Sequence, residues 1–162
     1  MRILIVSDSH GRHYWLEEVV RRVGHIDMML HLGDSEGWDD YIAGLVDCPL
    51  KIVAGNNDFF QGLDSELLFE IEGHRIFMTH GHRYGVNRGT DRLWYRGKEL
   101  EADIVMFGHT HCPYLSEIDG ITILNPGSIS LPRQSPRTPS FILMEIDKKG
   151  QTHYAINFVE EN

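Results

Sequence analysis

Five short polar clusters, each directly after an apolar run, contain the side chains of this sequence that are best suited to metal chemistry. The clusters are Asp8-Ser9-His10, Gly33-Asp34, Gly55-Asn56-Asn57-Asp58, His80-Gly81-His82 and Gly108-His109-Thr110-His111. Carboxylate, imidazole and amide oxygen together suit manganese, iron, zinc or nickel better than a metal that prefers thiolates. The clusters therefore predict a site for divalent metal ions.

The number of candidate ligands favours two ions over one. One catalytic zinc ion uses three or four ligands, and a bridging carboxylate can hold two ions about 3.5–4 Å apart. Asp34, the central carboxylate of the series, is the natural bridge. The clusters offer seven good ligands, more than one such ion uses.

Each cluster also has a purely structural interpretation. Asp8 and Asp34 could cap helix N-termini, and Asn56 and Asn57 are common turn residues. A single histidine such as His80 is more often a hydrogen-bonded, half-buried side chain than a ligand. We favour the metal site because a structural interpretation must explain all five clusters at once, each at an expected strand end.

The apolar runs before the clusters predict alternating strands and helices in the first part of the chain. Residues 2–6, 28–32 and 50–54 are strand-like, whereas residues 13–24 and 38–46 have helical spacing. Such alternation is typical of a parallel sheet, and ligands bind at the carboxyl ends of its strands. The clusters are therefore expected to meet at one edge, although they are far apart in the sequence.

The remainder of the chain predicts hairpins, so the sheets are expected to be mixed. Strand-like runs joined by turns lie at residues 67–81, with Glu72-Gly73 at the turn, and at residues 114–125 and 140–159. A helix is expected from Thr90 to Leu100, and a long loop from Pro126 to Pro139. No repeat or linker divides the sequence, which indicates a single domain over residues 1–162.

Charge and cysteine content limit the classes of partner. The formal net charge is −9, from 15 Lys and Arg against 24 Asp and Glu, which argues against nucleic acid as a general partner. Two bound dications would add four positive charges, giving −5, so a small anionic substrate remains compatible. Cys48 and Cys112 are isolated, and no signal peptide or membrane span is recognisable, so we expect a cytoplasmic protein without membrane attachment.

In this order, the blocks DSH, GD, GNND, THGH and GHTH resemble the five signature blocks of the calcineurin-like metallophosphoesterases. The compact length, the opening DSHG and the later NPGSISLPR resemble the small YfcE-type phosphodiesterases of bacteria and archaea. The resemblance implies an α/β fold, α+β by some schemes, in which two mixed β-sheets pack as a sandwich flanked by helices.

The resemblance also implies two divalent ions, with Mn²⁺ expected first and Ni²⁺, Zn²⁺ or Fe²⁺ as alternatives. Two dications against two ligand carboxylates leave a formal +2, which favours a phosphate and lowers the pKa of a bridging water. The resulting hydroxide would attack phosphorus. One ion would be bound by Asp8, His10, Asp34 and His111, and the other by Asp34, Asn56, His80 and His109.

Further residues are candidates for assisting the reaction. Asn57, His82 and Ser128 could contact the phosphate, Arg133 could bind the substrate, and Asp58 is expected to orient a ligand. Many relatives have His where this chain has Asn57, and a neutral amide cannot protonate a leaving group. We therefore expect aryl phosphodiesters to be cleaved faster than alkyl ones.

A metal-dependent phosphodiesterase is the function that we expect, and three alternatives stay open. The same metal pair could serve a phosphomonoesterase. A nuclease or cyclic-nucleotide phosphodiesterase would use arginines such as Arg83, Arg88, Arg133 and Arg137 on phosphates. A non-catalytic scaffold, like the retromer subunit that resembles this fold, is disfavoured because all seven ligand positions are intact.

We also consider a homo-oligomer. The aromatic side chains of Phe59, Phe60 and Trp94 could make a subunit contact, although packing against the chain's own core or loops is the commoner role of such residues.

Overall fold

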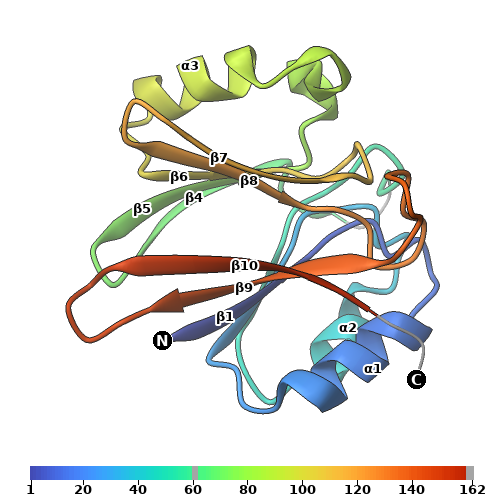
Figure 1. Ribbon diagram of the computed structural model, residues 1–162. Coiled ribbons are helices and arrows are strands. Elements are labelled where there is room, and N and C mark those ends of the chain that lie inside the picture. The colour runs from blue at the N-terminus through green and yellow to red at the C-terminus, as the bar shows by residue number, and fades with distance from the viewer. Residues whose placement is uncertain (60–61, 160–162) are drawn as a thin grey trace.

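Two β-sheets packed face to face form the centre of the molecule (Figure 1). This computed structural model describes residues 1–59 and 62–159. Helices α1 and α2 cover the outer face of one sheet and α3 covers the outer face of the other (Figure 1). The expected α/β sandwich of two mixed sheets is thereby confirmed. No helix among the described residues is long and apolar enough to cross a membrane.

The first sheet has the strand order β10-β9-β1-β2-β3. Strands β1, β2 and β3 are parallel, as the alternation of strands and helices predicts, whereas β9 is antiparallel to both β1 and β10. The bounds are Arg2–Val6 for β1, Met28–His31 for β2, Leu50–Ile52 for β3, Ser140–Ile146 for β9 and Thr152–Phe158 for β10, with helices α1 at Tyr14–Val23 and α2 at Asp39–Gly44.

The second sheet has the order β4-β5-β6-β8-β7. Strands β5, β6 and β8 are parallel, and the hairpins β4–β5 and β7–β8 add an antiparallel strand at each edge. The bounds are Glu66–Ile71 for β4, His74–Thr79 for β5, Ile104–Met106 for β6, Pro113–Ile118 for β7 and Ile121–Pro126 for β8, with the 3₁₀ helices η1 at His82–Tyr84 and η2 at Val86–Arg88, and helix α3 at Asp91–Glu99.

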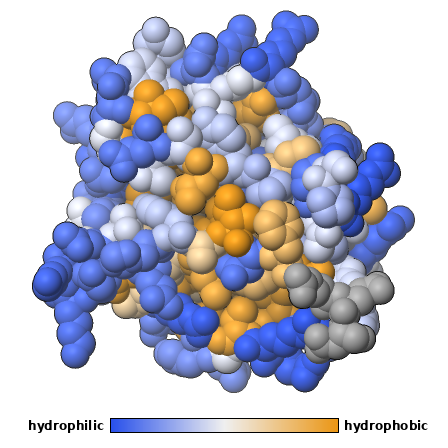
Figure 2. All heavy atoms as spheres, in the orientation of Figure 1, coloured by the Kyte–Doolittle hydropathy of each residue, from blue (hydrophilic) through white to orange (hydrophobic). Residues whose placement is uncertain are grey.

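The alternation of side chains along β1 explains why its sequence is apolar without a break. Ile3 and Ile5 pack in the core between the sheets, whereas Leu4 and Val6 pack in the core against α1 and α2. A strand buried on both faces needs apolar residues at every position. Figure 2 shows hydrophobic residues along the seam between the two sheets on the face drawn in Figure 1. This double burial fixes the register of β1 and hence where its loop emerges.

One expectation differs from the structure, and another is borne out. Helix α2 covers Asp39–Gly44 and is shorter than the expected residues 38–46; Val46, beyond it, packs partly buried against the core. Trp94 is half-buried, packs against the core of the second sheet and donates from its Nε1 to the carbonyl of Ile118 at 3.2 Å, so it has the packing role that we named as the commoner one. Phe59 is 77% exposed, and Phe60 lies outside the described residues.

Candidate metal centre

The five polar clusters meet at one edge of the sandwich, because each follows a parallel strand at its carboxyl end. The loops after β1, β2 and β3 come from the first sheet, and those after β5 and β6 come from the second. Backbone hydrogen bonds join neighbouring loops: the N–H of Asp8 donates to Gly33 at 3.0 Å, and that of Gly108 donates to His80 at 3.0 Å. Both sheets therefore contribute ligands to one site.

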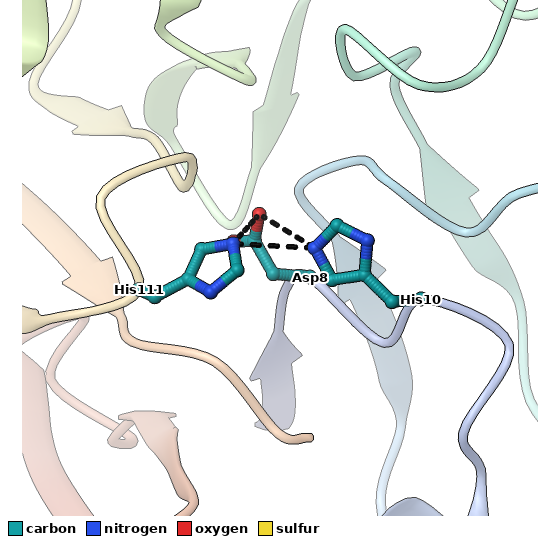
Figure 3. A group of neighbouring side chains, drawn as sticks. All are labelled: Asp8, His10 and His111. Carbon is teal, nitrogen blue, oxygen red and sulfur yellow. Dashed lines mark hydrogen bonds and ion pairs between the residues drawn. The ribbon is translucent and has the colours of Figure 1, made fainter. Parts of the chain in front are cut away.

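The first group of candidate ligands comes from the loops after β1 and β6. Figure 3 shows the side chains of Asp8, His10 and His111 pointing toward one another. His111 Nε2 lies 3.2 Å from Asp8 Oδ1 and 3.2 Å from His10 Nε2. His10 Nε2 lies 3.7 Å from Asp34 Oδ2. These separations suit donor atoms around one metal ion, whose bonds to nitrogen and oxygen are about 2.0–2.2 Å long.

The second group surrounds the other side of Asp34. His80 Nε2 lies 3.5 Å from Asp34 Oδ2 and 3.1 Å from Asn56 Oδ1. His109 Nδ1 lies 2.9 Å from the same Asn56 oxygen. Asp8 Oδ1 is 3.8 Å from His80 Nε2, so Asp8 borders this group as well. The structure thus brings the side chains of all seven predicted ligands close together, and their division between two ions stays a prediction.

Three of the four imidazoles are fixed through the ring nitrogen that faces away from the centre. Nδ1 of His80 lies 2.6 Å from the carbonyl of Leu32, and Nδ1 of His111 lies 2.7 Å from that of Leu131. Nδ1 of His10 lies 2.7 Å from Oε1 of Glu36. Because these oxygens only accept, each Nδ1 carries the proton and donates it, which leaves Nε2 able to bind metal.

His109 has the opposite orientation. Its Nδ1 faces Asn56, and its Nε2 lies 3.2 Å from the side-chain amide of Asn87. Binding a metal through Nδ1 requires a proton on Nε2, which the amide oxygen of Asn87 would accept once the side chain is turned by about 180°. Asn87 is therefore placed to orient His109.

Five of the seven candidate ligands have left-handed backbone conformations. The φ angles are 54° at Asp8, 46° at His10, 58° at Asp34, 66° at His109 and 58° at His111. Such conformations are uncommon outside glycine and cost on the order of 1–3 kcal/mol each when the surrounding structure enforces them. Their concentration in these loops is typical of a functional site rather than of ordinary turns.

Ser128 supports the strained backbone of Asp8. The hydroxyls of Ser128 and Ser130 each donate to the carbonyl of Asp8 at 2.8 Å, and Ser128 is fully buried. Its hydroxyl also accepts from the backbone N–H of Leu131 at 2.8 Å. The expectation that Ser128 contacts a substrate is therefore corrected, because its donor is already engaged and no surface of it is accessible.

Asp58 and Asn57 hold the central carboxylate in place. Asp58 is buried and accepts hydrogen bonds from the backbone N–H groups of Asp34, Ser35, Glu36 and Gly55. Asn57 donates from its backbone and from its side chain to the two oxygens of Asp34, each at 2.8 Å. Both residues thus fix the position of Asp34, one through its backbone and one through its carboxylate.

The helix-capping interpretation of the two aspartates fails. Helix α1 begins after His13 and α2 after Trp38, and neither N-cap makes a side-chain hydrogen bond. Asp8 and Asp34 lie in the preceding loops instead, with 0% and 2% of their surface exposed. Buried carboxylates need compensating charge or hydrogen bonds, and here the surrounding imidazoles are the candidates.

The charges of the centre are strongly coupled. Burial opposes ionisation of Asp34, but its hydrogen bond with His80 and those from Asn57 hold its pKa far below the usual range. Burial likewise opposes protonation of His80, yet Asp34 and Asp8 raise its pKa overall. A proton on His80 would therefore compete with a cation for the same position.

The protonated forms of two other imidazoles are disfavoured. Burial, followed by the charge of His80, lowers the pKa of both His82 and His109. The ring of His82 lies 5.5 Å from that of His80, and its buried Nδ1 has no hydrogen-bond partner among residues 1–59 and 62–159. Its assisting role stays a prediction.

The donor set fits divalent cations. Asp8 Oδ1 is buried and receives no hydrogen bond within the described part of the chain, although three imidazole nitrogens surround it. Where those nitrogens carry lone pairs, they and the carboxylate oxygen repel one another. A cation among Asp8, His10 and His111, and another among Asp8, Asp34 and His80, would relieve this repulsion. Carboxylate, imidazole and amide oxygens are suitable ligands for such an ion.

The sequence did not point to every residue of the centre. Glu36 and Asn87, which contact His10 and His109, were not singled out, because nothing in their local pattern indicates a partner far along the chain. Arg133 is exposed, and its backbone N–H donates to His111 at 3.0 Å. Its proposed contact with a substrate stays a prediction.

The chain belongs to the calcineurin-like phosphoesterase superfamily, whose domain matches residues 1–149. It is 37% identical over 153 residues to the probable metallophosphoesterase YsnB of Bacillus subtilis, a match that covers 94% of this chain and 88% of that one. A conserved protein of Streptococcus pneumoniae, described as a predicted phosphoesterase, has a similar solved structure with a TM-score of 0.81 at 36% identity, covering 98% of this chain and 88% of that one.

Two other relatives have names that suggest different roles. The phosphodiesterase YfcE of Escherichia coli is 35% identical over 63 residues, which cover 39% of this chain and 30% of that one. A single-mutant form of Vps29 from Entamoeba histolytica matches with a TM-score of 0.79 at 26% identity, over 99% of this chain and 100% of that one. The expected family is confirmed.

Proposed function

We propose that this chain is a phosphodiesterase with a dinuclear centre, for which Mn²⁺ is the metal that we expect. The observation that carries the proposal is the position of Asp34, whose Oδ2 lies 3.7 Å from His10 Nε2 and 3.5 Å from His80 Nε2. One carboxylate oxygen is thus within reach of both groups of ligands, which is the place of a ligand shared by two ions. The other proposed ligands are Asp8, His10 and His111 for one ion, and Asn56, His80 and His109 for the second.

The residues of the chain supply position and charge. When bound, two divalent ions would stabilise the phosphoryl oxygens and lower the pKa of the water that attacks phosphorus. The hydrogen bonds on the remote nitrogens of His10, His80 and His111 hold these rings before any substrate arrives. Such preorganisation is the main source of catalysis in phosphoryl transfer.

A scaffold function is a second candidate, and the likeness to Vps29 favours it. A scaffold needs a binding surface and does not need converging metal ligands. In this chain the ligand atoms of Asp8, Asp34 and His80 lie within 4.8 Å of one another, as do those of Asp8, His10 and His111. These converging ligand atoms support a metal-dependent enzyme over a scaffold.

Substrate and location complete the proposal. A small phosphodiester suits a chain with a net charge of −9, and the name of the relative YfcE supports a diester over a monoester. A phosphomonoesterase remains the alternative within enzymes, because the same pair of ions can serve either ester. The free thiols of Cys48 and Cys112 are compatible with the reducing cytoplasm, where we place the protein.

The test is hydrolysis of bis(p-nitrophenyl) phosphate and p-nitrophenyl phosphate by metal-stripped protein, with Mn²⁺, Ni²⁺, Zn²⁺ or Mg²⁺ added back. We expect metal to restore diester cleavage, His80→Ala to abolish it, and His25→Ala, which changes a histidine on an exposed loop, to retain it. Faster monoester cleavage would favour the phosphatase. No turnover with any metal would favour the scaffold.

A further inference from the structure

We propose that the segment between β5 and α3, together with the first turn of α3, forms an anion-binding pocket beside the metal centre, and that the substrate is a phosphodiester carrying a second phosphate group. This inference rests on the proposed function and names a substrate class for the same site. The pocket has a volume of about 260 Å³ and is lined by Tyr84, Gly85, Arg88, Gly89, Asp91 and Arg92.

The pocket is joined to the metal centre through the chain and through side chains. Its first residue, Tyr84, follows the block that supplies His80 and His82 by two positions. Asn87, between two lining residues, contacts Nε2 of the candidate ligand His109 at 3.2 Å. Asn87 thus ties the loop that lines the pocket to a candidate ligand, and the proposal requires that a diester at the centre extends one ester group toward this loop.

The two arginines of the pocket are available for an anion. Arg88 and Arg92 are exposed, and the arginine ion pairs of the described residues belong to others: Arg2, Arg21, Arg22 and Arg96. Arg92 folds back over the loop, since its Nη1 would lie 3.9 Å from a Cβ on Gly85. Guanidinium groups offer paired donors that match the oxygens of a phosphate.

The remaining walls of the pocket are glycine backbone, the start of α3 and the ring of Tyr84. Gly85 and Gly89 have φ angles of 64° and 138° and no side chain, so the backbone is accessible to a ligand. Helix α3 begins at Asp91, so the positive end of its dipole adds to the two arginines. The hydroxyl of Tyr84 donates to Oε1 of Glu66 and is not available to a ligand, so Tyr84 contributes only its ring to the wall of the pocket.

One acidic residue opposes the anion and supplies a test in the opposite direction. The residues that line the pocket include one carboxylate, that of Asp91, and two guanidinium groups, those of Arg88 and Arg92. Its removal should strengthen the binding of a phosphate, because a like charge disfavours an anion at short range. The pocket is positive overall although the whole chain is strongly acidic.

The experiment compares two esters that differ only in the second phosphate: thymidine 5′-(p-nitrophenyl phosphate) and the same ester with a 3′-phosphate. We expect kcat/KM of the Mn²⁺-loaded protein to be roughly tenfold higher for the second ester. In the double variant R88A/R92A, the ratio of kcat/KM for the ester with the 3′-phosphate to kcat/KM for the ester without it should fall toward one. The variant K148A/K149A removes the same charge in the distant β9–β10 turn and should keep the ratio. Asp91→Asn should raise it.

A ratio near one in the unchanged protein, or a ratio that R88A/R92A leaves intact, would overturn the pocket while the simpler ester is still cleaved. Cleavage of neither ester would contradict the proposed function instead. In that case the pocket is tested by calorimetric binding of thymidine 3′,5′-bisphosphate and thymidine 5′-phosphate. The protein should bind the bisphosphate more tightly. R88A/R92A should remove this preference, K148A/K149A should keep it and Asp91→Asn should increase it.

Discussion

Glu36 is the ligand support that differs most from its counterparts. It gives His10 a carboxylate as acceptor, whereas His80 and His111 have backbone carbonyls. A carboxylate partner orients the ring and makes its metal-binding nitrogen more basic. We expect Glu36→Gln to weaken the binding of Mn²⁺ by about 10- to 100-fold, measured by isothermal titration calorimetry.

The matched control is Glu70→Gln, which makes the same change at an exposed residue of β4. It should leave the affinity for Mn²⁺ unchanged. If both variants bind as tightly as the original protein, Glu36 does not support His10.

We expect Asn57 to determine which leaving groups are tolerated. Its side chain donates to Asp34, and an amide cannot protonate a departing alkoxide. We expect an aryl methyl phosphate to be cleaved faster than a matched dialkyl phosphate, by a factor larger than their difference in intrinsic reactivity. In Asn57→His the ratio of these two cleavage rates should be smaller. Equal rates on the two esters in the original protein would count against this account.

Burial of His31 makes the stability of the folded chain depend on pH. Its Nδ1 accepts from the N–H of Gly33 at 3.2 Å, so its Nε2 carries the proton and donates to Ser9 at 3.0 Å. Burial lowers the pKa of His31 to about 4, below the usual value near 6.5. Between these values the unfolded chain takes up a proton that the folded chain does not, so the stability present above pH 6.5 is lost toward pH 4.

The loss attributable to His31 is about 3 kcal/mol between pH 6.5 and pH 4. Urea unfolding across this range measures it, with His31→Gln as the variant that cannot gain the proton. The free energy of unfolding of that variant should fall less with acidification. Parallel curves for the two proteins would show that His31 does not titrate in this way.

At the scale of elements, the loops after the strands depend on close approach between backbones. A Cβ on Gly55 would lie 2.1 Å from Asp34 Oδ1 and 2.4 Å from its N. Gly55→Ala should therefore displace Asp34, destabilise the fold by about 1–3 kcal/mol and weaken metal binding. Denaturant unfolding and calorimetry with Mn²⁺ measure the two effects.

Gly44 provides the comparison, because it ends α2 and a Cβ there would meet no atom within 4 Å. Gly44→Ala should be neutral or stabilising by up to about 1 kcal/mol, with metal binding unchanged. The account of the loop fails if Gly55→Ala behaves in the same way.

The sequence predicts elements well where periodicity is strong. The strands before the clusters, the hairpin at Glu72-Gly73 and the helix near Thr90 are confirmed, because alternating or helical apolar positions reflect local burial. The end of α2 was less predictable, since Val46 is apolar and packs on the core without being helical. Apolar residues just beyond a helix have the same pattern as residues within it.

Long-range contacts limited the prediction of the site. The ligand types are visible in the sequence because each belongs to a short polar cluster at a strand end, and each of these clusters stands beside or contains a glycine. The roles of Ser128 and Glu36 depend on partners that lie 120 and 26 positions away, which no local pattern encodes. Sequence reasoning therefore identified the groups that would touch the ions more readily than the groups that hold them.

At the scale of the whole molecule, the centre depends on how the two sheets pack. Asp8, Asp34 and Asn56 follow strands of the first sheet, whereas His80 and His109 follow strands of the second. The core between the sheets, formed by residues such as Ile5 and Met78, holds these edges in register. Both proposed ions need ligands from both sheets, so metal binding and the packing of the sandwich should stabilise each other.

The number of metal ions bound per chain is the most direct test of the central claim. Elemental analysis of protein equilibrated with Mn²⁺ and freed of excess metal should give two ions for the original protein and about one for His111→Ala. Asp34→Ala, which removes the shared ligand, should lose most of both ions. One ion or none in the original protein, or two ions retained in Asp34→Ala, would contradict a dinuclear centre bridged by Asp34.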